Sequence, residues 1–232
     1  MTPNHSSIQQ TRSDFDRIAE LPEPPWHIDD RIVRRLIRKI PPVAATCLEV
    51  GCGTGRVTQL LLEHVGFLRA VDLSERMIEQ ARRRCTKSNV QFETADIREV
   101  AIPEKSLDVI VTVATLHHID LEWFFESCAL WLRPGGVLLV LDLAPAKGWT
   151  ALPQNIAGAL YAHTASVVFN YRIMPSRQSR AAWAEHAKHD SFHSLAEIKH
   201  CACNLLPQAE IRRRFPWRYT LTWCAPMQSN GA

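Results

Sequence analysis

The stretch that decides the fold is CLEVGCGTGR, which runs from Cys47 to Arg56. An apolar run that includes Glu49 leads here into a glycine-rich turn. The three glycines of this turn are Gly51, Gly53 and Gly55. Glycine has no Cβ, so the chain can turn sharply and a ligand can approach the backbone closely. Residues 56–64 then predict a helix whose first amide groups face that ligand.

The glycine spacing separates two kinds of cofactor site. Dinucleotide enzymes carry G-x-G-x-x-G after their first strand, whereas this chain has G-x-G-x-G. A carboxylate at Glu49 would repel a pyrophosphate, which argues against NAD. Residues 49–55 have the form E-x-G-x-G-x-G, and in this they resemble the first motif of the class I S-adenosylmethionine-dependent methyltransferases. The resemblance implies that Glu49 accepts a hydrogen bond at the amino-acid end of the cofactor; a chance glycine turn is the alternative.

A second acid follows at the expected distance. Residues 67–72 predict a strand that ends in Asp72, where a doubly wound fold binds the ribose hydroxyls. Ser74 predicts the N-cap of a helix, because its hydroxyl can accept a hydrogen bond from a free amide of the first turn. Leu73 is expected to cover one face of the adenine. Met77 lies at helical spacing and suits either the core or the adenine pocket.

Two further strands extend the pattern. Residues 90–94 lead to Asp96 and Ile97, where the resemblance implies contacts to the adenine edge, although Asp commonly begins a turn. Residues 107–112 form an apolar run typical of a parallel strand buried on both faces. The cofactor set predicted in this way is Glu49, Gly51, Cys52, Gly53, Gly55, Asp72, Leu73, Met77, Asp96, Ile97, Val113 and Ala114.

The fourth strand runs into two adjacent histidines, His117 and His118. Methyl transfer depends mainly on in-line placement of the acceptor, but a protonated acceptor also needs a base. Histidine has an ordinary pKa of about 6.5, so either residue is a candidate base. The alternative is that one packs under the sheet and the other only shapes the pocket. Asp142, at the end of the fifth strand, would contact the acceptor or cap the next helix.

The spacing of the remaining histidines predicts no metal site. His186, His189 and His193 lie near Asp190 in the sequence. This spacing matches no closed set of metal ligands.

The order of elements predicts an α/β fold with a Rossmann-like, doubly wound, seven-stranded sheet, mostly parallel with an antiparallel last strand. We expect one domain over residues 1–232. Its parts are N-terminal cap helices (1–45), a cofactor-binding core (46–142), a helical lid over the acceptor (143–193) and a C-terminal helix with a strand pair (194–232). The lid residues that could line a pocket are Trp149, Tyr161, His163, Tyr171, Met174 and Trp183.

Composition limits the partners. The 232 residues are 46% hydrophobic and carry a formal charge of +3, too little on its own to indicate nucleic acid. The basic residues of 31–39 alternate with apolar ones, which predicts an amphipathic helix with a solvated face. Seven cysteines without CxxC spacing, together with the absence of an apolar signal core or membrane span, predict a cytoplasmic protein with reduced thiols. A homodimer is left open.

These observations favour an enzyme that transfers a methyl group from S-adenosylmethionine to an oxygen, nitrogen or carbon of a small molecule. A tRNA or protein methyltransferase is the first alternative. It would require a basic docking surface or an added domain. A protein that binds S-adenosylmethionine without methylating is the second.

Overall fold

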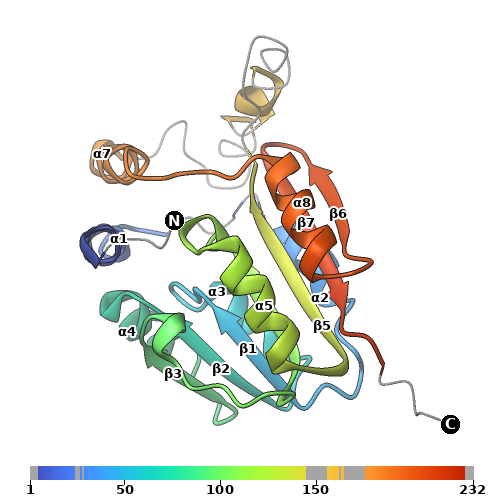
Figure 1. Ribbon diagram of the computed structural model, residues 1–232. Helices are drawn as coiled ribbons and strands as arrows, with labels where there is room; N and C mark the ends of the chain where they lie inside the picture. The colour runs from blue at the N-terminus through green and yellow to red at the C-terminus, as the bar shows by residue number, and fades with distance from the viewer. Residues whose placement is uncertain are drawn as a thin grey trace, which may run out of the picture.

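The computed structural model describes residues 5–23, 27, 29–144, 156–161, 163–164 and 176–227. One seven-stranded sheet runs through it in the order β3-β2-β1-β4-β5-β7-β6 (Figure 1). The strands are β1 Thr46–Val50, β2 Phe67–Asp72, β3 Val90–Thr94, β4 Leu107–Val113, β5 Leu132–Leu143, β6 Glu210–Arg214 and β7 Arg218–Cys224. Strand β7 is antiparallel to both of its neighbours, and the other pairs are parallel. The predicted fold class is confirmed.

The helices fill the connections between these strands. They are α1 His5–Ala19, α2 Asp30–Ile37, α3 Arg56–Leu61, α4 Glu75–Arg84, α5 Leu121–Trp131, α7 Arg177–His186 and α8 Leu195–Leu205, with 3-10 turns η1 Ile97–Glu99 and η2 Leu116–His118. The strand order reverses between β1 and β4, which is the switch point where open parallel sheets bind ligands.

The central strands bury both faces, because successive side chains point to opposite sides of a sheet. Leu48, Ile110 and Leu138 pack on one side in a cluster that includes residues of α5 and α8. Cys47 and Val109 pack on the other side, in a cluster with residues of α2, α3 and α4. In Figure 1, α5 and α8 accordingly lie in front of the sheet, with α2 and α3 behind it.

Two helices that are far apart in the sequence meet beside α4. Helix α1 contacts both α4 and α7, and the three lie next to one another in Figure 1. Ile18 and Ala19 of α1 form a small buried cluster with Met77 of α4 and Ala182 of α7. The N-terminal cap and the segment after β5 therefore cover the same part of the molecule.

Strand β5 contains Pro134, Gly135 and Gly136 near its start, residues that are uncommon inside strands, yet it begins at Leu132. Its pairing with β4 shifts register between Leu107 and Val109, so the Pro and Gly residues are absorbed as an irregularity inside the strand. The helix predicted over residues 56–64 ends earlier, at Leu61.

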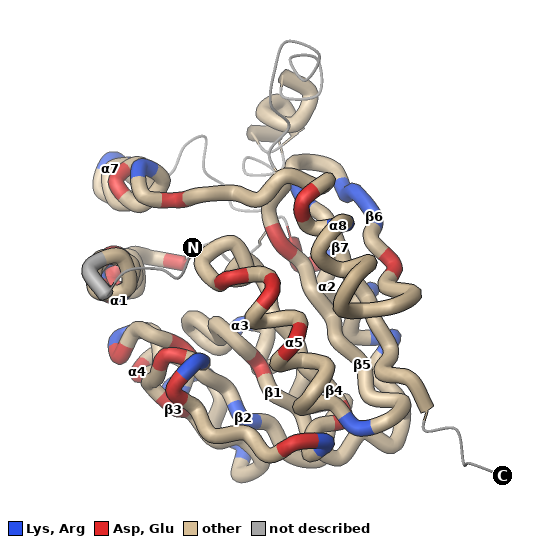
Figure 2. Tube along the Cα trace, in the orientation of Figure 1, with Lys and Arg blue, Asp and Glu red and all other residues tan. Residues whose placement is uncertain are grey.

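The basic helix is as predicted. In α2, Val33, Leu36 and Ile37 are buried, while the basic residues between 31 and 39 are exposed. Figure 2 shows acidic and basic residues interspersed over the visible elements, with a basic run on β6. Among the helices of the described part of the chain, none has the length and apolar character that a membrane crossing requires.

Asp108 fixes the start of β4 against the start of β1. Its Oδ2 accepts hydrogen bonds from the amides of Ala45 and Thr46, both at 2.8 Å, and from the Thr46 hydroxyl at 3.0 Å. Its Oδ1 lies 3.1 Å from the guanidinium of Arg133. Partial burial opposes ionisation, but the bonds from Thr46 and Ala45 and the charge of Arg133 together lower the pKa of Asp108.

We expect Asp108→Asn to lower the free energy of unfolding at pH 7 by about 1–3 kcal/mol, because hydrogen bonds to a charged acceptor are worth more than those to an amide. Since the folded-state pKa lies below the unfolded value, this contribution is complete above about pH 5 and is lost as the pH falls through the folded pKa. Urea unfolding at pH 7 and pH 3 measures both effects. The exposed Glu63→Gln is the control; an equal loss at both pH values would contradict the assignment.

Candidate active site

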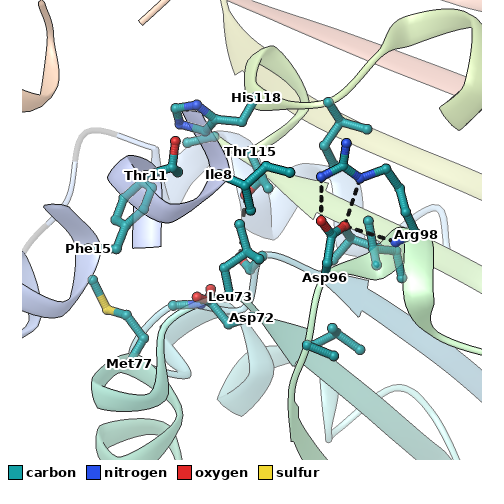
Figure 3. A pocket seen from close by; sticks show the side chains of 18 of the residues that line it. Ile8, Thr11, Phe15, Asp72, Leu73, Met77, Asp96, Arg98, Thr115 and His118 are labelled. Atoms are coloured by element: carbon teal, nitrogen blue, oxygen red, sulfur yellow. Dashed lines mark hydrogen bonds and ion pairs between the residues drawn. The ribbon is translucent and has the colours of Figure 1, made fainter. Parts of the chain in front are cut away.

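Two adjoining cavities lie at the carboxyl ends of β1 and β4. The first, of about 240 Å³, is bounded by β1, β2 and α1 and contains Asp72, Asp96 and His118 (Figure 3). The second, of about 620 Å³, lies toward α2 and contains Glu49 and Arg56. The lining residues common to both are Gly51, Gly53, Met77, Val113, Ala114 and Trp183. The two spaces thus meet at the glycine turn that the sequence singled out.

The three glycines differ in what an added Cβ would contact. All have positive φ, which favours glycine over any residue with a Cβ. A Cβ on Gly51 would lie 2.1 Å from Oγ1 of Thr115, so this glycine allows the loop after β4 to approach the turn. A Cβ on Gly53 would meet nothing within 4 Å and would project into open space. Gly55, also predicted to contact the cofactor, lines neither cavity, and a Cβ on it would lie 3.0 Å from Ala81.

Asp72 is held by backbone amides at the end of β2. Its Oδ2 accepts from the amide of Gly53 at 2.8 Å, and its Oδ1 accepts from the amide of Ser74 at 2.9 Å. Ser74 in turn caps α4, as predicted. Burial raises the pKa of Asp72. A carboxylate has about four lone-pair sites, so both oxygens keep acceptor capacity toward the cavity.

Glu49 is the most deeply buried acid of the cavity walls. It is 2% exposed, and its Oε2 lies 2.6 Å from the hydroxyl of Thr58. Burial raises the pKa of Glu49 to about 8; the Thr58 hydrogen bond opposes this shift, and the charge of Asp72 adds to it. Burial therefore favours a protonated Glu49 at neutral pH, and a cationic ligand beside the carboxyl group would favour its ionised form.

The residues predicted to contact the adenine lie together in the first cavity, but the Asp96 carboxylate already has a partner. Leu73, Met77 and Ile97 line this cavity, as does Asp96. Both oxygens of Asp96 bind Arg98, however: Oδ1 accepts from its amide at 3.0 Å and from its Nε at 2.9 Å, and Oδ2 from a terminal nitrogen of the same guanidinium (Figure 3). The carboxylate begins the turn η1, which is the alternative that the sequence left open.

His117 and His118 have different surroundings, although they are adjacent. His117 is buried and lines neither cavity. Its Nδ1 lies 2.7 Å from Oδ1 of Asp142, and its amide donates to Oδ2 at 2.8 Å. Asp142 was expected to contact the acceptor or cap the next helix; in the structure both of its carboxylate oxygens bind His117. The two residues are 25 positions apart, so sequence spacing could not pair them.

His118 lines the first cavity, and its ring is visible at the cavity wall in Figure 3. Its Nε2 is buried without a hydrogen-bond partner among the described residues. Burial, followed by the charges of His117 and His186, lowers the pKa of His118 to about 2. Its imidazole is therefore neutral at physiological pH. Its Nδ1 lies 3.8 Å from Oδ1 of Asp190.

Helix α1 supplies a wall that the sequence only outlined. Cap helices were expected over residues 1–45, and Phe15 of α1 lines the first cavity. Its neighbours one and two turns earlier, Ser7, Ile8 and Thr11, were missed, although their helical spacing puts them on one face. Among the predicted lid residues, Trp183 lines both cavities, whereas Tyr161 and His163 are exposed and line neither. Trp149, Tyr171 and Met174 lie outside the described residues.

Comparison with known proteins agrees with this architecture. Residues 48–140 match the family described as a methyltransferase domain. An uncharacterised methyltransferase of Mycobacterium tuberculosis is 26% identical over 206 residues, which are 88% of this chain and 98% of that protein. A ubiquinone biosynthesis O-methyltransferase of Coxiella burnetii is 24% identical over 174 residues, 69% of this chain and 73% of that protein. The fold also matches the DhpI–SAH complex, with a TM-score of 0.64 and 20% identity over 97% of this chain and 100% of that one.

The sheet order, the glycine turn at its switch point and the matched domain define a class I methyltransferase. Residues 48–140 form a methyltransferase domain of this class, and S-adenosylmethionine is its cofactor.

The two central glycines give a matched pair of variants. Gly51→Ala is expected to destabilise the fold by about 1–3 kcal/mol through crowding against Thr115 and by about 1–2 kcal/mol through its positive φ. Gly53→Ala carries only the second penalty, but its methyl group enters the cavity and should weaken cofactor binding by about tenfold or more, which is about 1.4 kcal/mol. Thermal unfolding and calorimetric titration separate the two effects. Unchanged cofactor affinity in Gly53→Ala would place the cofactor elsewhere.

Glu49 predicts a pH dependence of cofactor binding. If the ionised carboxylate binds the cofactor's ammonium group, the free protein must release a proton below its pKa of about 8. Affinity should then rise as the pH is raised from 6 to 8, by up to about tenfold per unit, and level off above. Titration in two buffers of different ionisation enthalpy measures the released proton. Glu49→Gln should bind more weakly at pH 8 and show no such release; a proton count unchanged by this substitution would assign the linkage to another group.

Proposed function

We propose that the protein transfers the methyl group of S-adenosylmethionine to an oxygen, nitrogen or carbon nucleophile of a small molecule. The observation that carries this is the second cavity, which adjoins the first at Gly51 and Gly53. Its volume of about 620 Å³ is in the range of small-molecule pockets, about 300–1,000 Å³. With the cofactor in the first space and the acceptor in the second, the methyl group and the nucleophile would meet near the wall that the two cavities share.

In this proposal the first cavity binds the adenosine part of the cofactor. Asp72 would accept from the ribose hydroxyls, and Leu73 and Ile97 would cover the adenine. Glu49, at the other side of the glycine turn, would pair with the ammonium group. Because Asp96 already binds Arg98, we assign the adenine contact to apolar packing and to the backbone at residues 96–97 rather than to that carboxylate.

Of the two candidate histidines, His118 is the one that reaches a cavity. Compared with a histidine of ordinary pKa, a full proton on His118 is disfavoured by about 6 kcal/mol, since each pKa unit is worth about 1.36 kcal/mol. We therefore assign to His118 the positioning, through a hydrogen bond, of the part of the acceptor that extends past the shared wall into the first cavity, and we attribute most of the rate to in-line placement. His117, fixed by Asp142, holds the turn that carries His118.

A small acceptor is favoured over tRNA or protein by two observations. Charged residues of both signs are mixed along the elements visible in Figure 2, with a formal total of +3, whereas a nucleic-acid-binding protein would show a predominantly basic patch. The similar Coxiella protein bears the name of an O-methyltransferase of ubiquinone biosynthesis, which is small-molecule chemistry.

The test is a search for S-adenosylhomocysteine formation with the purified chain. Phenols, amines, carboxylic acids and acidic carbon compounds form one arm, and tRNA and a protein extract form two others. Gly53→Ala is the cofactor-defective control. Product with a small molecule alone supports the proposal. Product with only tRNA or protein, or tight cofactor binding with no product in any arm, contradicts it.

For any acceptor found, His118→Gln should lower kcat by about 100-fold, which is the cost of misplacing a reacting group by about 1 Å. His118 stays neutral over the physiological pH range. The pH profile of the wild-type rate should therefore contain no inflection near pH 6.5 that is due to His118, and His118→Gln should not alter the profile there. His189→Gln, in an exposed position nearby, is the control. Wild-type kcat in His118→Gln, or such an inflection, would remove His118 from its assigned role.

A further inference from the structure

Three imidazoles and three carboxylates meet beside the first cavity. We refer to them as the histidine cluster, whose members are Asp14, His117, His118, Asp142, His186 and Asp190. The ring centroids of His117 and His118 are 4.0 Å apart, and those of His118 and His186 are 5.3 Å apart. The cluster joins α1, η2, β5 and α7, so it lies where the cap meets the core. Groups of this kind are expensive to bury unless each has a partner.

Two members have conventional partners. Asp14 is 2.6 Å from the guanidinium of Arg17 and also accepts from Gln10. Asp142 accepts from the amides of His117 and Leu143. Because a carboxylate only accepts, Nδ1 of His117 carries the proton of its 2.7 Å contact with Asp142. The other nitrogen, Nε2, then has a free lone pair, which is how an outer carboxylate prepares a histidine for a metal ion.

Asp190 and His118 lack such partners. Oδ1 of Asp190 is buried and accepts no hydrogen bond within the described part of the chain. It lies 3.3 Å from Nε2 of His186, but not in hydrogen-bonding geometry, and 3.8 Å from Nδ1 of His118. Nε2 of His118 is likewise buried and unpartnered. A buried carboxylate oxygen thus lies 3.8 Å from one nitrogen of an imidazole whose other nitrogen is also buried without a hydrogen-bond partner among the described residues.

We propose that His117, His118 and Asp190 bind one divalent first-row transition-metal ion. One ligand atom from each lies within 4.8 Å of the other two. Bonds of about 2.0–2.2 Å place ligand atoms roughly 3.5 Å apart, so closure requires a shift of about 1 Å. Two imidazoles and one carboxylate suit zinc or iron rather than magnesium or calcium, which prefer oxygen ligands. Three protein ligands leave a coordination position open, as in catalytic zinc sites.

The sequence predicted no metal site, because the spacing of Asp190 and the histidines near it in the chain matches no set of metal ligands. The ligands proposed here come instead from residues 117–118 and 190, which the fold brings together. His189 is half exposed and lies near Glu185 on the outside of the cluster. It therefore supplies a matched control that removes a neighbouring imidazole without touching the site.

The experiment uses the full chain without a histidine tag, stripped with EDTA and dialysed. Calorimetric titration with ZnCl₂ and with CoCl₂ should show one equivalent bound, with Zn²⁺ raising the thermal midpoint. Asp190→Asn and His118→Gln should each weaken binding at least about tenfold, since loss of even an outer-shell partner costs about 10–100-fold. His189→Gln should bind as the wild type does. Thermal unfolding in EDTA establishes that each variant is folded.

The seven cysteines require a second test, because thiolates also bind Zn²⁺. The visible spectrum of bound Co²⁺ distinguishes nitrogen and oxygen ligands from thiolate, which adds a sulfur-to-cobalt charge-transfer band. No binding by the wild type, binding retained by both Asp190→Asn and His118→Gln, or a thiolate band would each overturn the proposal. The readouts are independent of methyl transfer, so they do not depend on the acceptor proposed above.

Discussion

The acids that end the parallel strands are the constraint on which the site depends. A carboxylate at the edge of a buried sheet must find donors, and here the donors are the backbone of the loops that form the cavities. Asp72 binds the amides of Gly53 and Ser74, so it fixes the glycine turn and the start of α4 together. Asp142 does the same for the turn after β4 through His117. The loops are therefore held in place before any ligand arrives.

The close approach of two of these loops explains an unusual backbone. Gly51 leaves room for Thr115, and between β4 and that threonine Ala114 takes a φ of 53°, a conformation that costs energy for any residue with a Cβ. Ala114 lines both cavities, and its amide donates to Leu141 at 2.8 Å. Strain of this kind collects where a fold positions a ligand, because the surrounding structure over-determines the chain there.

Much of this could be predicted from the sequence, because the informative patterns are local. Short apolar runs indicated the strands, and the glycine turn with the acids of β1 and β2 located the cavities. The contact of Asp142 with His117 was not predicted, because it spans 25 residues and depends on strand order. Ser7, Ile8 and Thr11 were missed for a similar reason: an amphipathic helix shows that it has a buried face, but not what that face covers.

The helix that covers the first cavity is tied to the residues it covers. Arg12 of α1 donates to the carbonyl of Leu73 at 2.8 Å, and Asp16 accepts from the hydroxyl of Ser74 at 2.5 Å. Both contacts fall on the loop that follows Asp72. Asp14 of the same helix reaches His186, 3.4 Å away, and so connects to the histidine cluster. Helix α1 therefore connects the loop after Asp72 to the histidine cluster. A change in charge at the loop or at the cluster would thus act on the same helix.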